Sequence, residues 1–114
     1  MINKYITTTK GDFIMAVEHT YTAKKSGSSF TSAAEVKADM RAICNDSAYF
    51  TYIDNTIAAG NLTLDESFDS GTQTLTVKRT WDDSTHASWK ASPPGNWANH
   101  ITDLEAAGYT ITIS

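Results

Sequence analysis

Residues 13–22, FIMAVEHTYT, place two kinds of side chain alternately along the chain. Side chains of a β-strand point alternately to opposite faces of its sheet, so this period of two predicts a strand with one face toward a core. Most of the large apolar residues belong to the odd-numbered set, which we expect to face inward: Phe13, Met15, Val17, His19 and Tyr21. Whatever fold forms must therefore cover that face of the strand.

Two helical segments are expected, each interrupted once. The sequence SAAE (32–35) has the pattern of a capping box that starts a helix. The helix pauses at CNDS (44–47), where Asn and Asp side chains compete for backbone hydrogen bonds, and its second half ends at Gly60. In the same way DDS (82–84) starts a helix, SPPGN (92–96) interrupts it, and Gly108 ends it.

The segments LTLDESF (62–68) and QTLTVKRTW (73–81) predict a hairpin whose turn, DSGT, has Gly71 available for a positive φ. A last strand follows in YTITIS (109–114). This β-α-β-β-α-β order predicts the α+β class. We expect a ferredoxin-like plait, a four-stranded antiparallel sheet in the order 4-1-3-2 with both broken helices on one face. Residues 13–114 would form one domain, and residues 1–12 a loose arm or an extra strand turning at KGD.

Composition excludes several classes of protein. The chain has 114 residues, 40% of them hydrophobic and 19% charged, which suits a single globular domain. Its net charge is −4 and its basic residues are scattered, so we expect no nucleic-acid partner. Polar residues interrupt every apolar stretch, so no membrane segment is expected. The first residues lack a secretory pattern and Cys44 cannot form an internal disulfide, which favours a cytoplasmic protein.

The inward-facing side chains change from aliphatic to polar and aromatic near the ends of two strands. We expect residues 13–22 and 73–81 to be parallel neighbours, so that these ends meet. Both helices would begin at the same edge, where free amide groups favour an anion. The predicted ligand-binding residues are those at this edge and in the first turns of the next helix: His19, Tyr21, Arg79, Trp81, His86 and Trp89.

Two interpretations of these residues remain open. All three tryptophans lie between residues 81 and 97, and they could simply form an aromatic core with histidines at its polar end. Alternatively they line a cleft for a small ligand. Arg79 is the decisive residue, because a buried guanidinium needs a partner. That partner is Glu66, Asp82 or the carboxylate of a ligand.

The opposite face of the predicted sheet is rich in threonine, including Thr20, Thr22, Thr74 and Thr76. It is either an open polar face or the contact surface of a homodimer. No spacing among His19, His86 and His100 suits a metal, and we expect no cofactor. Cys44 falls on the apolar stripe of a helix and is interpreted as a small core residue.

The segments VKRTWDDSTHASWKA (77–91) and AAGYTITIS (106–114) resemble the dimeric α+β barrel group. That group includes antibiotic-biosynthesis-monooxygenase-like domains and small uncharacterised proteins of marine phages and environmental sequences. The resemblance implies a homodimer formed sheet against sheet, with a cavity between the sheet and the helices of each subunit. Members of the monooxygenase branch act on aromatic substrates without metal or flavin. The first strand of this chain carries no counterpart of the asparagine linked with that activity.

These observations favour a small ferredoxin-like protein, a homodimer with a cleft for a small apolar or acidic molecule. One alternative is a cofactor-independent monooxygenase or isomerase that uses His19 or His86 as a base. The other is a virus-encoded accessory or structural protein whose surface meets its partners.

Overall fold

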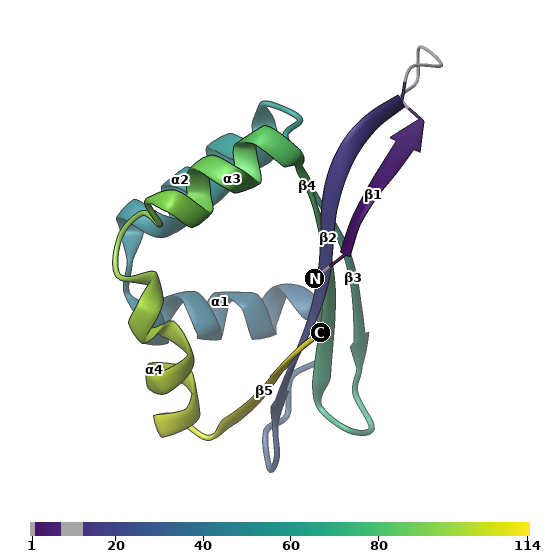
Figure 1. The fold of residues 1–114 in the computed structure, drawn as a ribbon. Coiled ribbons are helices and arrows are strands. Elements are labelled where there is room, and N and C mark those ends of the chain that lie inside the picture. Colours follow the sequence, from purple (N-terminus) through teal and green to yellow (C-terminus); the bar gives the residue numbers. More distant parts are fainter. Residues whose placement is uncertain (1, 8–12) are drawn as a thin grey trace.

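The computed structural model describes residues 2–7 and 13–114, with side chains from residue 16 onward. Its strands are β1 (Ile2–Thr7), β2 (Phe13–Lys25), β3 (Leu62–Asp69), β4 (Thr74–Asp82) and β5 (Tyr109–Ile113). Its helices are α1 (Ala33–Cys44), α2 (Ser47–Ala58), α3 (Asp83–Ala91), a short 3₁₀ turn at Trp97–Asn99 and α4 (His100–Ala106). All the helices lie on one side of the sheet (Figure 1). None of these helices is long and apolar enough to cross a membrane.

The predicted α+β class and strand order are confirmed. Strand β2 pairs with β4 on one side and β4 pairs with β3, while β5 pairs with the C-terminal half of β2 on its other side. The N-terminal half of that same edge is covered by β1, so residues 2–7 form an extra strand rather than an arm. The turn expected at KGD lies outside the residues that the structure describes.

The expectation that residues 13–22 and 73–81 run parallel is wrong, because β2 and β4 are antiparallel. A crossover through helices leaves β2 and β3 pointing the same way, and the hairpin then reverses the chain into β4. As a result α1 begins beyond Lys25 at one end of the sheet and α3 begins after Asp82 at the other. The two helix starts therefore do not meet, and no shared anion site is formed by them.

The predicted helix breaks are confirmed. Helix α1 starts at the Ser32 cap, whose side chain accepts a hydrogen bond from the Glu35 amide, and it ends at Asn45 in the left-handed conformation. Helix α2 starts at the Asp46 cap two residues after Cys44. Helix α3 starts at the Asp82 cap and ends before the proline pair. Each crossover is therefore made of two short helices that turn, rather than one straight helix.

The hairpin forms where predicted, but Gly71 does not supply its positive φ. That conformation falls on Gln73, with φ of 53°. The Asp69 carboxylate accepts hydrogen bonds from the Gly71 and Thr72 amides, which closes the turn early. The Gln73 side chain is meanwhile held by hydrogen bonds to both backbone groups of Phe30. Long-range contacts thus override the local glycine preference.

Two hydrophobic clusters fill the space between the sheet and the helices. One is formed by buried residues under α2 and α3: Val17, Tyr49, Ile53, Leu62, Trp81 and Trp89. The other is formed under α1 and α4: Ala23, Val36, Leu75, Val77, Leu104 and Tyr109. On β2 and β4 the residues between these clusters are His19, Tyr21 and Arg79, and they are only partly buried. A polar band therefore crosses the inner face of the sheet between two cores.

A carboxylate, Asp46, ties the second crossover to the first. Its Oδ2 accepts hydrogen bonds from the Asn96 amide at 2.6 Å and from His100 Nε2 at 2.8 Å. The backbone of the SPPGN segment passes so close that a Cβ placed on Gly95 would clash with Asp46 Oδ1. Gly95 also has a φ of 62°. This position therefore requires glycine for two separate reasons.

We expect Gly95→Ala to lower the free energy of unfolding more than Gly60→Ala does. Both residues have positive φ, which costs a non-glycine residue about 1 to 2 kcal/mol, but a Cβ on Gly60 would meet nothing within 4 Å. The clash with Asp46 adds a packing cost of about 1 to 3 kcal/mol in Gly95→Ala alone. Urea denaturation of both variants measures the difference, and equal losses would contradict the close approach.

Candidate functional site

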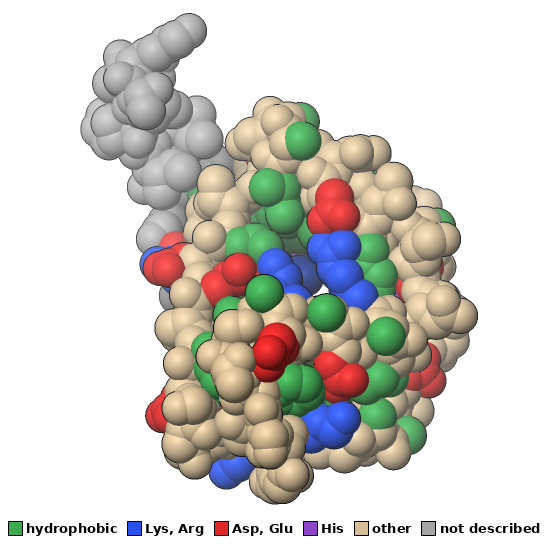
Figure 2. Space-filling view, turned by 180° about the vertical axis from the view of Figure 1, so that it is seen from behind, with side chains coloured by type: hydrophobic (Ala, Val, Ile, Leu, Met, Phe, Trp, Pro, Cys, Tyr) green, Lys and Arg blue, Asp and Glu red, His purple; other side chains and the backbone are tan. Residues whose placement is uncertain are grey.

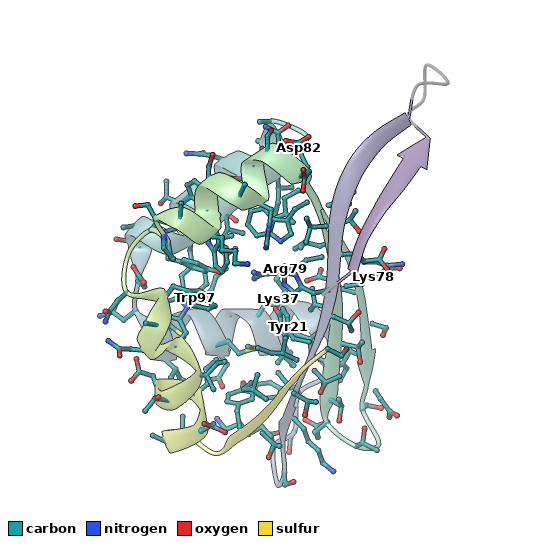
Figure 3. The ribbon with its side chains drawn as sticks, viewed as in Figure 1. Tyr21, Lys37, Lys78, Arg79, Asp82 and Trp97 are labelled. Carbon is teal, nitrogen blue, oxygen red and sulfur yellow. The ribbon has the colours of Figure 1, made fainter. Side chains whose placement is uncertain are left out.

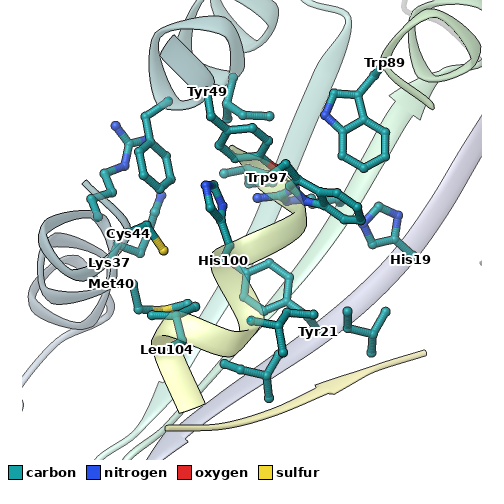
Figure 4. A pocket seen from close by; sticks show the side chains of 18 residues that line it. His19, Tyr21, Lys37, Met40, Cys44, Tyr49, Trp89, Trp97, His100 and Leu104 are labelled. Carbon is teal, nitrogen blue, oxygen red and sulfur yellow. Dashed lines mark hydrogen bonds between the residues drawn. The ribbon is translucent and has the colours of Figure 1, made fainter. Parts of the chain in front are cut away.

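A cavity of about 140 Å³ lies between the sheet and the helices, at the level of the polar band. Residues of β2, β3, β4 and β5 line it on the side of the sheet, and residues of α1, α2, α3 and α4 line it on the side of the helices (Figure 4). Most of its lining is apolar or aromatic, including Met40, Phe50, Trp97 and Leu104. A cavity of this kind, apolar with a few converging polar groups, is the usual form of a small-ligand site.

Four of the six predicted ligand-binding residues line this cavity: His19, Tyr21, Arg79 and Trp89. His19 and Arg79 are direct partners across β2 and β4, so they share the inner face of the sheet. The two residues are neighbours because β2 and β4 pair antiparallel, which brings them together in the middle of the sheet. They do not meet at a shared end of two parallel strands, as the sequence had predicted. Figure 3 shows Arg79 directed toward the helices while its neighbour Lys78 points away from them.

The other two predicted residues, Trp81 and His86, do not line the cavity. Trp81 is 1% exposed and His86 is 5% exposed, and their rings pack edge to face at 5.6 Å between centroids. His86 also contacts the rings of Trp89 and His19, at 5.8 and 6.3 Å. The tryptophan-rich segment thus contributes both to the core and to the cavity, since Trp81 is core whereas Trp89 is core and cavity wall at once.

The partner of Arg79 is not a carboxylate of the described chain. Glu66 pairs instead with Lys37, at 2.8 Å, and Asp82 caps α3 through Ser84 and Thr85. Arg79 Nη1 donates to the Tyr49 hydroxyl at 3.2 Å. Its guanidinium carbon lies 5.3 Å from the centre of the Tyr21 ring, within range of a cation–π contact. These groups orient the guanidinium but do not neutralise its charge.

The cavity opens toward a surface that carries two further cations. Figure 2 shows lysine and arginine side chains gathered around a hollow on this face. Lys37 and Arg41 belong to the lining of the cavity and of a neighbouring surface depression between α1 and Glu66. Arg41 binds Asp54 through two hydrogen bonds, of 2.7 and 2.9 Å. Both cations at the mouth are therefore paired, in contrast to Arg79.

Five buried side-chain nitrogens have no hydrogen-bond partner in the described part of the chain: His19 Nδ1, Arg79 Nε, Trp81 Nε1, His86 Nε2 and Trp89 Nε1. All belong to the residues predicted from the sequence, and three of those residues line the cavity. An unsatisfied buried polar group costs about 1 to 3 kcal/mol. Arginine and tryptophan nitrogens only donate hydrogen bonds, so this wall presents donors in need of acceptors.

The environment of the cavity disfavours further positive charge. Burial lowers the pKa of His19 from 6.5 to about 4, and the charge of Arg79 and the neighbouring His86 add to this. Burial also lowers the pKa of His86, and Lys90 adds to that effect while Asp83 opposes it. Both imidazoles are therefore neutral at pH 7. The guanidinium of Arg79 is permanently charged, so the inner wall of the cavity carries a single positive charge.

The sequence reasoning missed Tyr49 and His100, which also line the cavity, and it left Trp97 out of the predicted ligand-binding residues although it allowed all three tryptophans to line a cleft. Tyr49 and His100 pack edge to face at 4.6 Å, and Trp97 packs edge to face on Trp89 at 4.8 Å. Tyr49 lies on the apolar stripe of its helix and is indistinguishable there from a core residue. In the sequence Asp46 cannot be told from a simple helix cap, although its carboxylate also accepts a hydrogen bond from the His100 ring.

Cys44 lies at the cavity as well, but as a thiol. Burial raises its pKa to about 11, and the nearby carboxylates of Asp103 and Asp46 contribute. A thiol in this state is a poor nucleophile and packs as a small apolar group. Within residues 16–114, no group of three or more His, Cys, Asp or Glu side chains is arranged to hold a metal ion.

Comparison with known proteins assigns neither a family nor a function to the chain. The chain matches no family model, no curated protein and no solved structure.

We expect His19 to titrate with a midpoint near pH 4 when followed by NMR. Because the unfolded chain takes up this proton near pH 6.5, the free energy of unfolding falls as the pH drops from about 6.5 to about 4. Arg79→Gln removes one cause of the shift, so it raises the midpoint, which stays below 6.5 because burial remains.

Lys78→Gln is the matched control, since Lys78 neighbours Arg79 in sequence but lies on the outer face, where its ammonium group is 3.9 Å from Glu18. It should leave the His19 midpoint unchanged. A wild-type midpoint between 6 and 7 would contradict the buried environment described for this ring.

Proposed function

We propose that the protein binds a small organic acid in its cavity, with the carboxylate on Arg79. The observation that carries this proposal is the Arg79 guanidinium itself. It lies among aromatic side chains, its Nε has no partner, and the two acidic residues that the sequence offered as partners, Glu66 and Asp82, are engaged elsewhere. A ligand carboxylate would supply the missing charge and the missing acceptors together.

The Tyr49 hydroxyl supports the same orientation. It accepts a hydrogen bond from Arg79, so its own proton remains available for an oxygen bound beside the guanidinium. The apolar lining supports an apolar body for the ligand. The volume of about 140 Å³ is close to that of cavities that hold a benzene ring, roughly 150 Å³. An aromatic ring with a short carboxylate arm satisfies both halves of the site.

A binding role suits the histidines better than base catalysis does. General bases work best when their pKa lies near the working pH. The pKa of His19, lowered to about 4 by burial and by Arg79, leaves this imidazole a weak base at neutral pH. We therefore expect mutation at this site to weaken binding of the ligand carboxylate to Arg79, and not to remove a catalytic base.

The connectivity supports our assignment of the fold to a variant of the ferredoxin-like plait. The order β5-β2-β4-β3 is the predicted 4-1-3-2 order, with β1 added beside β2 and each crossover helix split in two. In this variant the split helices curve over the sheet, and the cavity lies beneath the two bends.

We expect wild-type protein to bind at least one acid among benzoate, phenylacetate and 3-phenylpropanoate in isothermal titration calorimetry, and to bind the matching amides far more weakly. Arg79→Gln should weaken acid binding about 100-fold, the loss of roughly 2.7 kcal/mol that a charged, hydrogen-bonded partner supplies.

The control for this experiment is Lys78→Gln, which changes the net charge equally from the outer face and should leave the dissociation constant within twofold of wild type. Acids that bind wild type and Arg79→Gln with the same affinity would contradict the proposed site, and so would equal binding of acids and amides.

We also propose that the threonine-rich outer face of the sheet is the contact surface of a homodimer. Thr22 and Thr76 are partners across β2 and β4 near the centre of this face, and both are only partly exposed. Light scattering should give a mass near twice the 12.4 kDa of the chain. Thr76→Glu should yield monomers, whereas Thr51→Glu on the exposed side of α2 should not. A monomeric wild type would contradict this proposal.

A further inference from the structure

The wall of the cavity beside Arg79 holds a second polar position. Trp89 is only 8% exposed, lines the cavity, and has no partner for its indole N–H. His19 lines the same cavity and has no partner for Nδ1. Both rings contact the ring of His86 behind them, at centroid distances of 5.8 Å for Trp89 and 6.3 Å for His19. They lie on the same side of the cavity in Figure 4.

These two nitrogens need opposite hydrogen-bond partners, one an acceptor and the other a donor. The indole N–H of Trp89 can only donate a hydrogen bond. His19 is neutral, and in its Nε2-protonated tautomer its Nδ1 can only accept. A hydroxyl group that reaches both nitrogens would satisfy both at once, because its oxygen accepts from Trp89 while its proton is donated to His19. An ether or a halogen on the ring supplies no such proton.

We propose that the ligand is a hydroxylated aromatic acid, whose ring hydroxyl is bound by Trp89 and His19 while its carboxylate is bound by Arg79. This inference rests on the proposed function and narrows its ligand class. One molecule would then give a partner to an unpartnered nitrogen on each of three residues that line the cavity, His19, Arg79 and Trp89. The remaining two, on Trp81 and His86, belong to the layer behind the wall and take no part in it.

The test compares each acid with its own ring-substituted derivatives. Benzoate, phenylacetate and 3-phenylpropanoate are titrated beside their 3- and 4-hydroxy and 3- and 4-fluoro forms, so that arm length and hydroxyl position both vary. In at least one series we expect the hydroxyl to tighten binding about tenfold, equivalent to about 1.4 kcal/mol. The fluoro derivative, which has no proton to donate, should bind like the parent acid.

Trp89→Phe should erase the gain from the hydroxyl while the parent acid still binds. Trp97→Phe is the matched control, since Trp97 lines the same cavity and packs on Trp89 but is 36% exposed. Because Trp97 lines the cavity, that variant is expected to change the affinity for both acids alike, and the ratio between hydroxy acid and parent acid should stay as in wild type. In wild-type protein, the indole N–H resonance of Trp89 should shift downfield with the hydroxy acid and not with its parent, a readout that needs no variant.

The possible failures are distinguishable. If parent acids bind through Arg79 but no hydroxyl derivative binds more tightly or shifts the Trp89 resonance, this inference is wrong and the proposed function stands. If no acid binds wild type, the proposed function fails and the inference with it. If the gain survives in Trp89→Phe, the hydroxyl is held elsewhere and the assignment of this subsite is wrong.

Discussion

The fold depends on one unusual constraint, a guanidinium on the inner face of its central strand pair. Aliphatic and aromatic side chains above and below Arg79 form two separate cores, and neither can close over a permanent charge that lacks a carboxylate. The Tyr49 hydroxyl and the Tyr21 ring shield the guanidinium without neutralising it. A cavity at this level is the physical consequence, because water or a ligand must reach the charge.

The bent crossovers keep that cavity open. A straight helix above the sheet would press its side chains onto the polar band, whereas the break at Asn45 and the SPPGN segment lead α2 and α4 around it. Asp46 fixes both bends at once, since it caps α2 and accepts hydrogen bonds from Asn96 and His100. The aromatic rings of Phe50 and His100 stack beside it and form part of the wall.

Local patterns in the sequence were sufficient for much of this architecture. Alternation fixed the inner faces of β2 and β4, and the caps at Ser32 and Asp82 fixed two helix starts. The relative direction of β2 and β4 was mispredicted, although the hairpin implies it. Tyr49 and His100 could not be assigned to the site, because helical periodicity does not separate a residue facing a cavity from one facing a core. The partner of Asp46 lies 54 residues away, beyond any local signal.

The proposal that a ligand neutralises the charge of Arg79 is tested most directly by a crystal structure of the protein with a bound aromatic acid. We predict a carboxylate oxygen within about 3.2 Å of an Arg79 nitrogen, which is the upper end of the normal N–H···O range. The aromatic ring of the acid should lie between Trp89 and Leu104. Density that places the acid on the outer face, or a side-chain carboxylate of the protein against Arg79, would contradict it.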